Sequence, residues 1–291
     1  MNSLYNFDIL SPDSLDEALS LMEEHRGVIK PLAGGTDVLV MVRNNHNDWG
    51  ETKMVLNLKS IQGLDFIRED DDFIEIGPLV THSQVIESVL IQEHVPSLIK
   101  AVKYIGSPQI RNQGTVVGNV CRGSPASDTL GVLYAREAQV VIQSVNGEKT
   151  VPIIEFLKGP GRSIISENSL VTGLRVPKLS GYIGDYFSLR QRKALSILVV
   201  SLAVEAQFDD EYSCCDVRIA LGAVAPTIVR AYKTEALLKN QVISEELIKQ
   251  AVELVKTESS PISDLRSNEE YRRAMTGILL ERFLGKIVDD K

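Results

Sequence analysis

The sequence predicts an α+β protein of two domains. The first, residues 1–177, is expected to combine a small β-α-β subdomain (about 1–58) with a larger α/β subdomain (about 59–177). The second, residues 182–291, is expected to be a three-stranded antiparallel sheet followed by helices. Three observations support this: 291 residues at 44% hydrophobic content are enough for two cores, the N-terminus has a strand–helix–strand pattern, and strand-like alternation after residue 182 gives way to helical spacing.

The N-terminal residues form the predicted β-α-β unit. Apolar and polar side chains alternate over residues 5–9, as in a half-buried strand. Ser14 and Glu17 make the S-x-x-E pattern that begins a helix, which Gly27 ends. The run Val28–Leu32 returns as a strand, and a helical crossover favours parallel pairing.

The larger subdomain mixes both kinds of element up to a boundary expected at Pro177–Gly184, which is rich in turn residues. Asn146-Gly147, between two alternating runs, indicates a β-hairpin, and Lys158–Arg162 is expected to be a rigid loop. The remaining predicted elements are helices at Val38–Arg43, from Thr81 or Ser83 to Leu90, at Ser97–Val102 and at Leu130–Ala138, and strands at Lys53–Leu58, Phe73–Ile76, Gln139–Val145, Glu148–Ile153 and Leu170–Val176.

The C-terminal domain begins with three runs typical of an antiparallel meander. They lie at Tyr182–Arg190, Ser196–Phe208 and Glu211–Ala223. Helices are expected at Ser244–Thr257 and from Ser267 onwards.

Composition excludes several classes of protein. The net charge is −8 and no basic run occurs, so no nucleic-acid partner is expected. Three cysteines predict neither a disulfide framework nor a cysteine-ligated cluster. The four histidines are scattered, which argues against a zinc site or a hydrolase. Neither a signal peptide nor a membrane span is visible, so a cytoplasmic location is expected.

The most informative stretch is GSPQIRNQGTVVGNVCRGSPASD, residues 106–128, in which almost nothing suits a helix. A second glycine loop, LAGGTD, lies between a strand-like and a helix-like run. Glycine permits close backbone approach, and loop N–H groups ahead of a helix suit a pyrophosphate. Two such loops suggest one elongated ligand, of which a nucleotide is the obvious candidate; two ordinary tight turns are the alternative. No G-x-G-x-x-G or Walker A pattern occurs.

These loops resemble a known family. LAGGTDVLV followed by IGSPQIRNQGTVVGNVCRGSPASD is similar to the FAD-binding medium subunit of the xanthine dehydrogenase and carbon monoxide dehydrogenase family, the molybdenum hydroxylases. The resemblance covers nearly the whole chain, with GPGR at 159–162 and LRQRKALSI at 189–197 as weaker matches. The family usually has two glycines before the asparagine of the second loop; here Val117 replaces the first, which leaves the backbone path at that residue open.

The resemblance implies that the first domain binds FAD, with no catalytic residue and no metal ligand on this chain. The implied cofactor-binding residues are Lys30, Pro31, Leu32, Ala33, Gly34, Gly35, Thr36, Asp37, Ile105, Gly114, Thr115, Val116, Val117, Gly118, Asn119, Ser124, Asp128, Leu170, Phe187 and Lys193.

Side-chain chemistry suggests roles within this set. The residues Gly34–Thr36 suit phosphate oxygens, whereas the carboxylate of Asp37 would repel them and is expected to cap the next helix or order the loop. The Thr115–Asn119 segment can reach phosphate or ribose, and Asp128 can accept from a ribose hydroxyl or ring N–H. Lys193 near the flavin would stabilise its anionic reduced form.

The apolar residues of the set have a second interpretation. The resemblance implies that Ile105 lies close to the flavin ring. Leu170 and Phe187 match positions where the family presses apolar side chains onto the cofactor, or they are plain core.

The resemblance also implies a function and partners. The chain would be the FAD-carrying electron-transfer subunit of a multi-subunit molybdenum hydroxylase, taking electrons from [2Fe–2S] clusters of a partner chain. FAD would pass them to NAD or another acceptor during hydroxylation of an N-heterocycle such as a purine or nicotinate. The implied partners are a molybdopterin-binding large subunit and a [2Fe–2S] small subunit. A stand-alone FAD-dependent oxidase and a non-catalytic nucleotide-binding regulator are the alternatives.

A docking face for the cluster-bearing partner is expected where basic residues stand out on an acidic chain. These are the loops around Lys103–Arg111 and Arg190–Lys193. Alternatively, Arg190 and Arg192 simply point outward from a strand.

Overall fold

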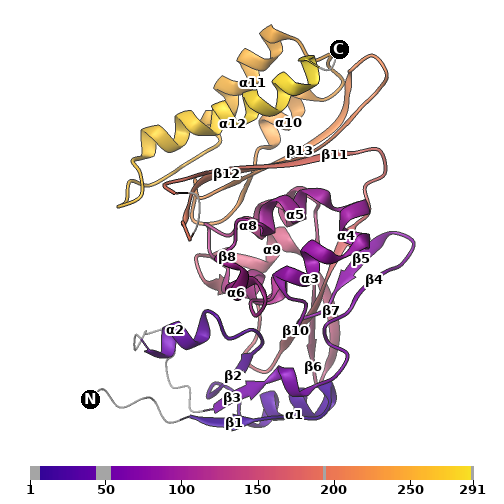
Figure 1. Cartoon of the computed structure of the whole chain (residues 1–291), viewed down its shortest axis with the longest axis vertical. Coiled ribbons are helices and arrows are strands. Elements are labelled where there is room, and N and C mark those ends of the chain that lie inside the picture. The colour runs from indigo at the N-terminus through magenta and orange to yellow at the C-terminus, as the bar shows by residue number, and fades with distance from the viewer. Residues whose placement is uncertain (1–6, 44–53, 193–194, 290–291) are drawn as a thin grey trace.

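The computed structural model of the protein describes residues 7–43, 54–192 and 195–289. The three larger sheets of the described residues follow one another along the molecule (Figure 1). These sheets and their helices confirm the predicted α+β class. Tyr5, which the sequence placed in the first strand, lies outside the described residues.

The N-terminal sheet is parallel, with strand order β1-β3-β2. Its strands are β1 (Asp8–Leu10), β2 (Ile29–Leu32) and β3 (Met54–Asn57). Helix α1 (Leu15–Glu24) begins as predicted, because Ser14 Oγ accepts a hydrogen bond from Glu17 N at 3.2 Å. Its buried face covers the sheet and builds a small core, so the β-α-β prediction is confirmed.

The second sheet is antiparallel, in the order β4-β5-β10-β6-β7. Its strands are β4 (Ile67–Glu69), β5 (Phe73–Ile76), β6 (Gln139–Ser144), β7 (Gly147–Pro152) and β10 (Leu170–Pro177). The elements around it are η2 (Leu58–Ser60), α3 (His82–Glu87), α4 (Val89–His94), α5 (Pro96–Val102), α8 (Asp128–Ala135) and α9 (Ile153–Phe156). The largest hydrophobic core lies between this sheet and its helices.

The glycine-rich stretch corrects one prediction, because it contains two short helices. These are α6 (Pro108–Arg111) and α7 (Val116–Arg122). Each begins at a hydroxyl cap, Ser107 or Thr115, and α7 ends at Gly123 with φ of 61°. Caps and a C-terminal glycine therefore outweighed the glycine content. The loop expected at 158–162 is also partly extended, as the hairpin β8 (Leu157–Gly159) and β9 (Arg162–Ser163).

The C-terminal sheet has four antiparallel strands rather than the predicted three. The three predicted strands are β11 (Ile183–Arg190), β12 (Leu198–Phe208) and β13 (Cys214–Gly222). The fourth, β14 (Val229–Arg230), is too short to show an alternating pattern. One face of this sheet carries α10 (Tyr232–Leu238), α11 (Glu245–Thr257) and α12 (Glu269–Asp289), of which α10 was not predicted. The other face rests on α5 and α8 (Figure 1).

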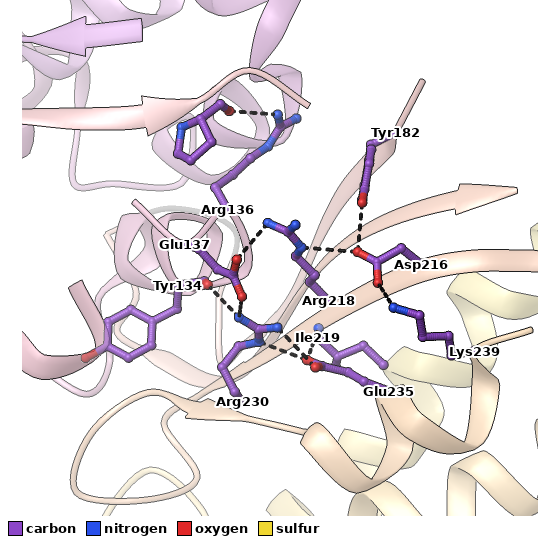
Figure 2. A network of polar contacts seen from close by, with 11 residues as sticks. Tyr134, Arg136, Glu137, Tyr182, Asp216, Arg218, Ile219, Arg230, Glu235 and Lys239 are labelled. Carbon is purple, nitrogen blue, oxygen red and sulfur yellow. Dashed lines mark hydrogen bonds and ion pairs between the residues drawn. The ribbon is translucent and has the colours of Figure 1, made fainter. Parts of the chain in front are cut away.

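Charged side chains cross the junction between α8 and the C-terminal sheet. Figure 2 shows Arg230 between Glu137 and Glu235, with nitrogen–oxygen distances of 3.1 and 2.8 Å. Arg218 pairs with the same Glu137 at 3.1 Å. Deeper inside, Arg136 and Glu205 pair at 2.9 Å, and each side chain is 1% exposed. These pairs fix how the two halves of the molecule meet. None of the described helices is long and apolar enough to cross a bilayer.

Candidate functional site

The two glycine loops lie directly against each other. The first, residues 33–37, connects β2 to α2 (Val38–Arg43), and the second leads into α7. A Cβ added to Gly34 would lie 2.1 Å from Gln113 O and 2.9 Å from Gly114 Cα. Only glycine permits such an approach, so the structure brings together the loops that the sequence predicted to hold one ligand.

An ion pair ties the two loops together, because Arg122 Nε of α7 pairs with Asp37 Oδ2 at 2.7 Å. Lys59 Nζ of η2 donates to Gln113 Oε1 at 2.7 Å and so links the second loop to η2. Asp37 therefore orders the loops, one of the two roles expected for it. Arg122 was absent from the predicted set; its place beside Gly123 in the second motif was the available signal.

The first loop presents unused hydrogen-bond donors. The main-chain N–H groups of Gly34, Gly35 and Thr36 donate to no acceptor among the described residues. All three residues are half-buried, and Gly35 has φ of 75°. Adjacent unpaired amides in a glycine turn form an anion-binding concavity. This donor set fits the diphosphate of FAD.

Helix α7 shows how the second loop is built. Thr115 Oγ1 accepts from Gly118 N at 3.0 Å and so caps the helix, while Gly118 is exposed. Val116 and Val117 are buried in the core of the first domain. Position 117 does not require a glycine, because Val117 occupies an ordinary helical position in α7. Contacts from the Thr115–Asn119 segment to a cofactor stay a prediction.

Neighbouring segments support this second loop. Asn119 Oδ1 accepts from Ser127 Oγ and, at 2.6 Å, from Thr129 Oγ1, while its amide nitrogen donates to none of the described residues. Gly161 N donates to Gly123 O at 3.1 Å, so the GPGR segment does lie beside the loop.

Asp128 is placed at the junction with the C-terminal domain. It is 7% exposed, and its Oδ1 accepts from Tyr186 OH at 2.5 Å and from Arg190. Burial raises the pKa of the Asp128 carboxyl, and the Arg190 guanidinium opposes that rise. Oδ2 is the oxygen without a hydrogen bond from a described residue, so a ribose contact stays a prediction for that atom.

The position of Arg190 corrects the expected docking face. Its side chain is 8% exposed and pairs with Asp128, and its guanidinium carbon lies 4.8 Å from the Tyr104 ring centroid. Alternation along β11 turns Tyr186, Ser188 and Arg190 toward the first domain. Arg190 is thus an interdomain residue, whereas Arg192 is exposed and donates to Leu195 O at 3.1 Å.

The other predicted residues are not all brought together. Leu170 packs in the small N-terminal core, and Phe187 lies against the C-terminal core with Lys286 Nζ 4.7 Å from its ring centroid. Ile105 packs against the core of the first domain. Ser124 Oγ accepts from Ala126 N at 3.2 Å, as in a turn.

The first and last residues of the predicted cofactor-binding set remain to be located. Lys30, Pro31 and Leu32 belong to β2, which pairs with β3 and delivers Ala33 to the first loop. Lys193 lies outside the described residues.

Comparison with known proteins identifies both halves of the chain. Residues 5–179 match the family model of the FAD binding domain in molybdopterin dehydrogenase. Residues 185–287 match the CO dehydrogenase flavoprotein C-terminal domain.

Individual relatives match over almost their whole length. The chain is 29% identical to the carbon monoxide dehydrogenase medium chain of Hydrogenophaga pseudoflava over 278 residues, 96% of each chain. It is 27% identical to the xanthine dehydrogenase FAD-binding subunit of Escherichia coli O157:H7 over 277 residues, 94% of each. A solved structure of carbon monoxide dehydrogenase from Hydrogenophaga pseudoflava, lacking the Mo-pyranopterin moiety, matches with TM-score 0.89 and 30% identity over 95% of both chains.

Proposed function

Because the chain belongs to the FAD-binding medium subunits of the xanthine dehydrogenase and carbon monoxide dehydrogenase family of molybdenum hydroxylases, we propose that it relays electrons within such an enzyme. They arrive from [2Fe–2S] clusters of a partner chain and leave from FAD to NAD or another acceptor. The observation that carries this proposal is the contact of the two glycine loops around the unpaired amides of Gly34–Thr36.

The chain's residues bind and orient the cofactor. FAD, when bound, supplies the redox chemistry of its flavin ring. The amides of Gly34–Thr36 would donate to its diphosphate, and the Asp37–Arg122 pair holds both loops in place. The Asp128–Arg190 pair fixes the C-terminal domain beside the second loop. We assign the FAD-binding unit to residues 1–177 and the C-terminal unit to residues 182–291.

The substrate and the remaining centres belong to other chains in this proposal. A molybdopterin-binding large subunit would hydroxylate an N-heterocycle such as a purine, and a [2Fe–2S] small subunit would link it to this one. The xanthine dehydrogenase relative supports a purine. Sequencing the chains that co-purify with this one, and assaying the complex on purines and nicotinate with NAD as acceptor, tests each part of the assignment.

FAD is expected to be bound without a covalent link. Cys121 lies in the second loop's helix, but burial raises the pKa of its thiol to about 12, so almost no thiolate is present at neutral pH. Acid precipitation of the yellow protein should leave all flavin in the supernatant, identified as FAD by chromatography. Flavin in the pellet would contradict the non-covalent mode, and a colourless protein that takes up no FAD would contradict the function itself.

The docking face is expected to include the exposed cations Lys103 and Arg192, and no longer Arg190, which is buried. The double variant Lys103→Glu, Arg192→Glu reverses two exposed charges and should lower co-purification with the cluster-bearing chain several-fold, because complementary charge speeds association. FAD content should stay normal. The control is Lys149→Glu on the exposed strand β7. Equal co-purification of both variants would place the docking face elsewhere.

A further inference from the structure

His82 is buried beneath the second glycine loop. The residue is 2% exposed, and its Nδ1 is buried with no hydrogen-bond partner among the described residues. A buried polar atom without a partner is costly. The presence of this histidine therefore calls for an explanation from its surroundings.

The backbone holds this ring against the loop. His82 N donates to Gly114 O at 3.0 Å, and Val116 N donates to Val80 O at 3.1 Å, so residues 80–82 pair with residues 114–116. Helix α3 itself is started by Thr81, whose side chain and Gln84 form a complete capping box. The His82 side chain is therefore not needed to form the helix and is free for another role.

The ring also lies close to the first loop. A Cβ on Gly114 would lie 3.3 Å from His82 Cδ2 and 3.2 Å from Thr36 Oγ1. The imidazole and the first loop's hydroxyl thus lie on the same side of Gly114. This is the place where the two loops that surround the unpaired amides touch.

We propose that His82 is a positioning residue of the FAD site, whose uncharged ring supports Gly114 and Thr36 and keeps the two loops in contact. This inference rests on the proposed FAD-binding role. The ring acts through the loops, which carry the donors to the diphosphate.

The charges around the ring explain why it must be neutral. Burial lowers the pKa of His82 to about 4, and the positive charge of Arg111 on α6 contributes the smaller part of this shift. The other charged groups on the neighbouring elements are engaged or remote: Asp37 pairs with Arg122, Lys59 bonds Gln113, Lys100 pairs with Asp185, and Glu87 is exposed at the far end of α3. A protonated ring would have no counter-charge and would push the loops apart.

The test is FAD affinity of the full chain, freed of cofactor, measured by quenching of flavin fluorescence. His82→Ala should weaken FAD binding about tenfold or more, while His82→Gln, uncharged and of similar length, should stay within about threefold. The matched control is Val85→Ala on the same helix, which is fully buried in the core of the first domain. It should lower the melting temperature and leave the dissociation constant within about twofold.

Chemical rescue tests the requirement for a neutral ring. Free imidazole should restore FAD binding to His82→Ala at about pH 8.5, where it is uncharged, and not at about pH 5.5, where it is mostly protonated, since imidazole groups titrate near 6.5. Unchanged affinity of His82→Ala, or equal rescue at both pH values, would overturn the inference while leaving FAD binding intact. Failure of the unsubstituted chain to bind FAD would overturn the proposed function as well.

Discussion

Replacing Gly34 with alanine is expected to weaken FAD binding at least about 100-fold, or roughly 3 kcal/mol. The new methyl group would lie 2.1 Å from Gln113 O, and this neighbour is backbone rather than a flexible side chain. The loops must therefore separate, and the amides of Gly34–Thr36 then lose the arrangement that suits a diphosphate. Because Gly34 is half-buried in a loop, the fold should survive.

The measurement pairs FAD titration with thermal melting followed by circular dichroism. The control is Gly159→Ala in β8, where an added Cβ meets nothing within 4 Å and no positive φ is required. That variant should bind FAD like the parent chain. If Gly34→Ala also binds normally, the contact between the loops does not shape the cofactor site.

Local signals explain most of what the sequence predicted correctly. Ser14 and Ser244 each sit before an apolar helical repeat, and both cap the expected helix. The two glycine motifs were recognisable because close backbone approach restricts the residue type. Val117 was the visible departure from the family pattern and left the backbone path there open, and its burial inside α7 resolves this.

The remaining features depend on contacts between distant parts of the chain. Asp128 and Arg190 are 62 residues apart in sequence, so neither motif alone shows that they pair. Arg190 therefore looked like a surface charge. His82 belonged to no motif, and its role depends on the fold bringing residues 80–82 beside the second loop.

Replacing Arg136 with methionine is expected to cost about 3–5 kcal/mol of unfolding free energy at neutral pH. Arg136 follows α8, Glu205 lies on β12, and their side chains pair at 2.9 Å with each 1% exposed. Removal of the guanidinium leaves the Glu205 carboxylate buried with the Ser97 hydroxyl, which donates to it at 2.5 Å. An isolated charge in a dry interior is far more costly than a hydrophobic side chain of similar size.

The stability lost in Arg136→Met should depend on pH, and the ionisation of Glu205 decides whether the loss grows or shrinks as the pH falls. Burial raises the pKa of this carboxyl, and Arg136 opposes the rise, so the pKa should climb further in the variant. At a pH between the ordinary glutamate pKa near 4.3 and the raised pKa, the folded variant keeps a proton on Glu205 that the unfolded chain has released. Its stability must increase as the pH falls through the raised value. Urea denaturation should show a smaller deficit at about pH 5.5 than at about pH 8.

A double variant separates the charge from the packing. Arg136→Met with Glu205→Leu removes both charges and should recover most of the lost stability, since a buried pair replaced by apolar residues is often neutral. The coupling between the two substitutions should therefore be large and favourable.

Because Arg136 and Glu205 join the first domain to the C-terminal sheet, the single variant should also shift the junction that Asp128 and Arg190 span beside the second loop. FAD affinity of Arg136→Met should fall with its stability and return in the double variant. A deficit below about 1 kcal/mol at pH 8 would show that water reaches Glu205 and that the pair does not fix this junction.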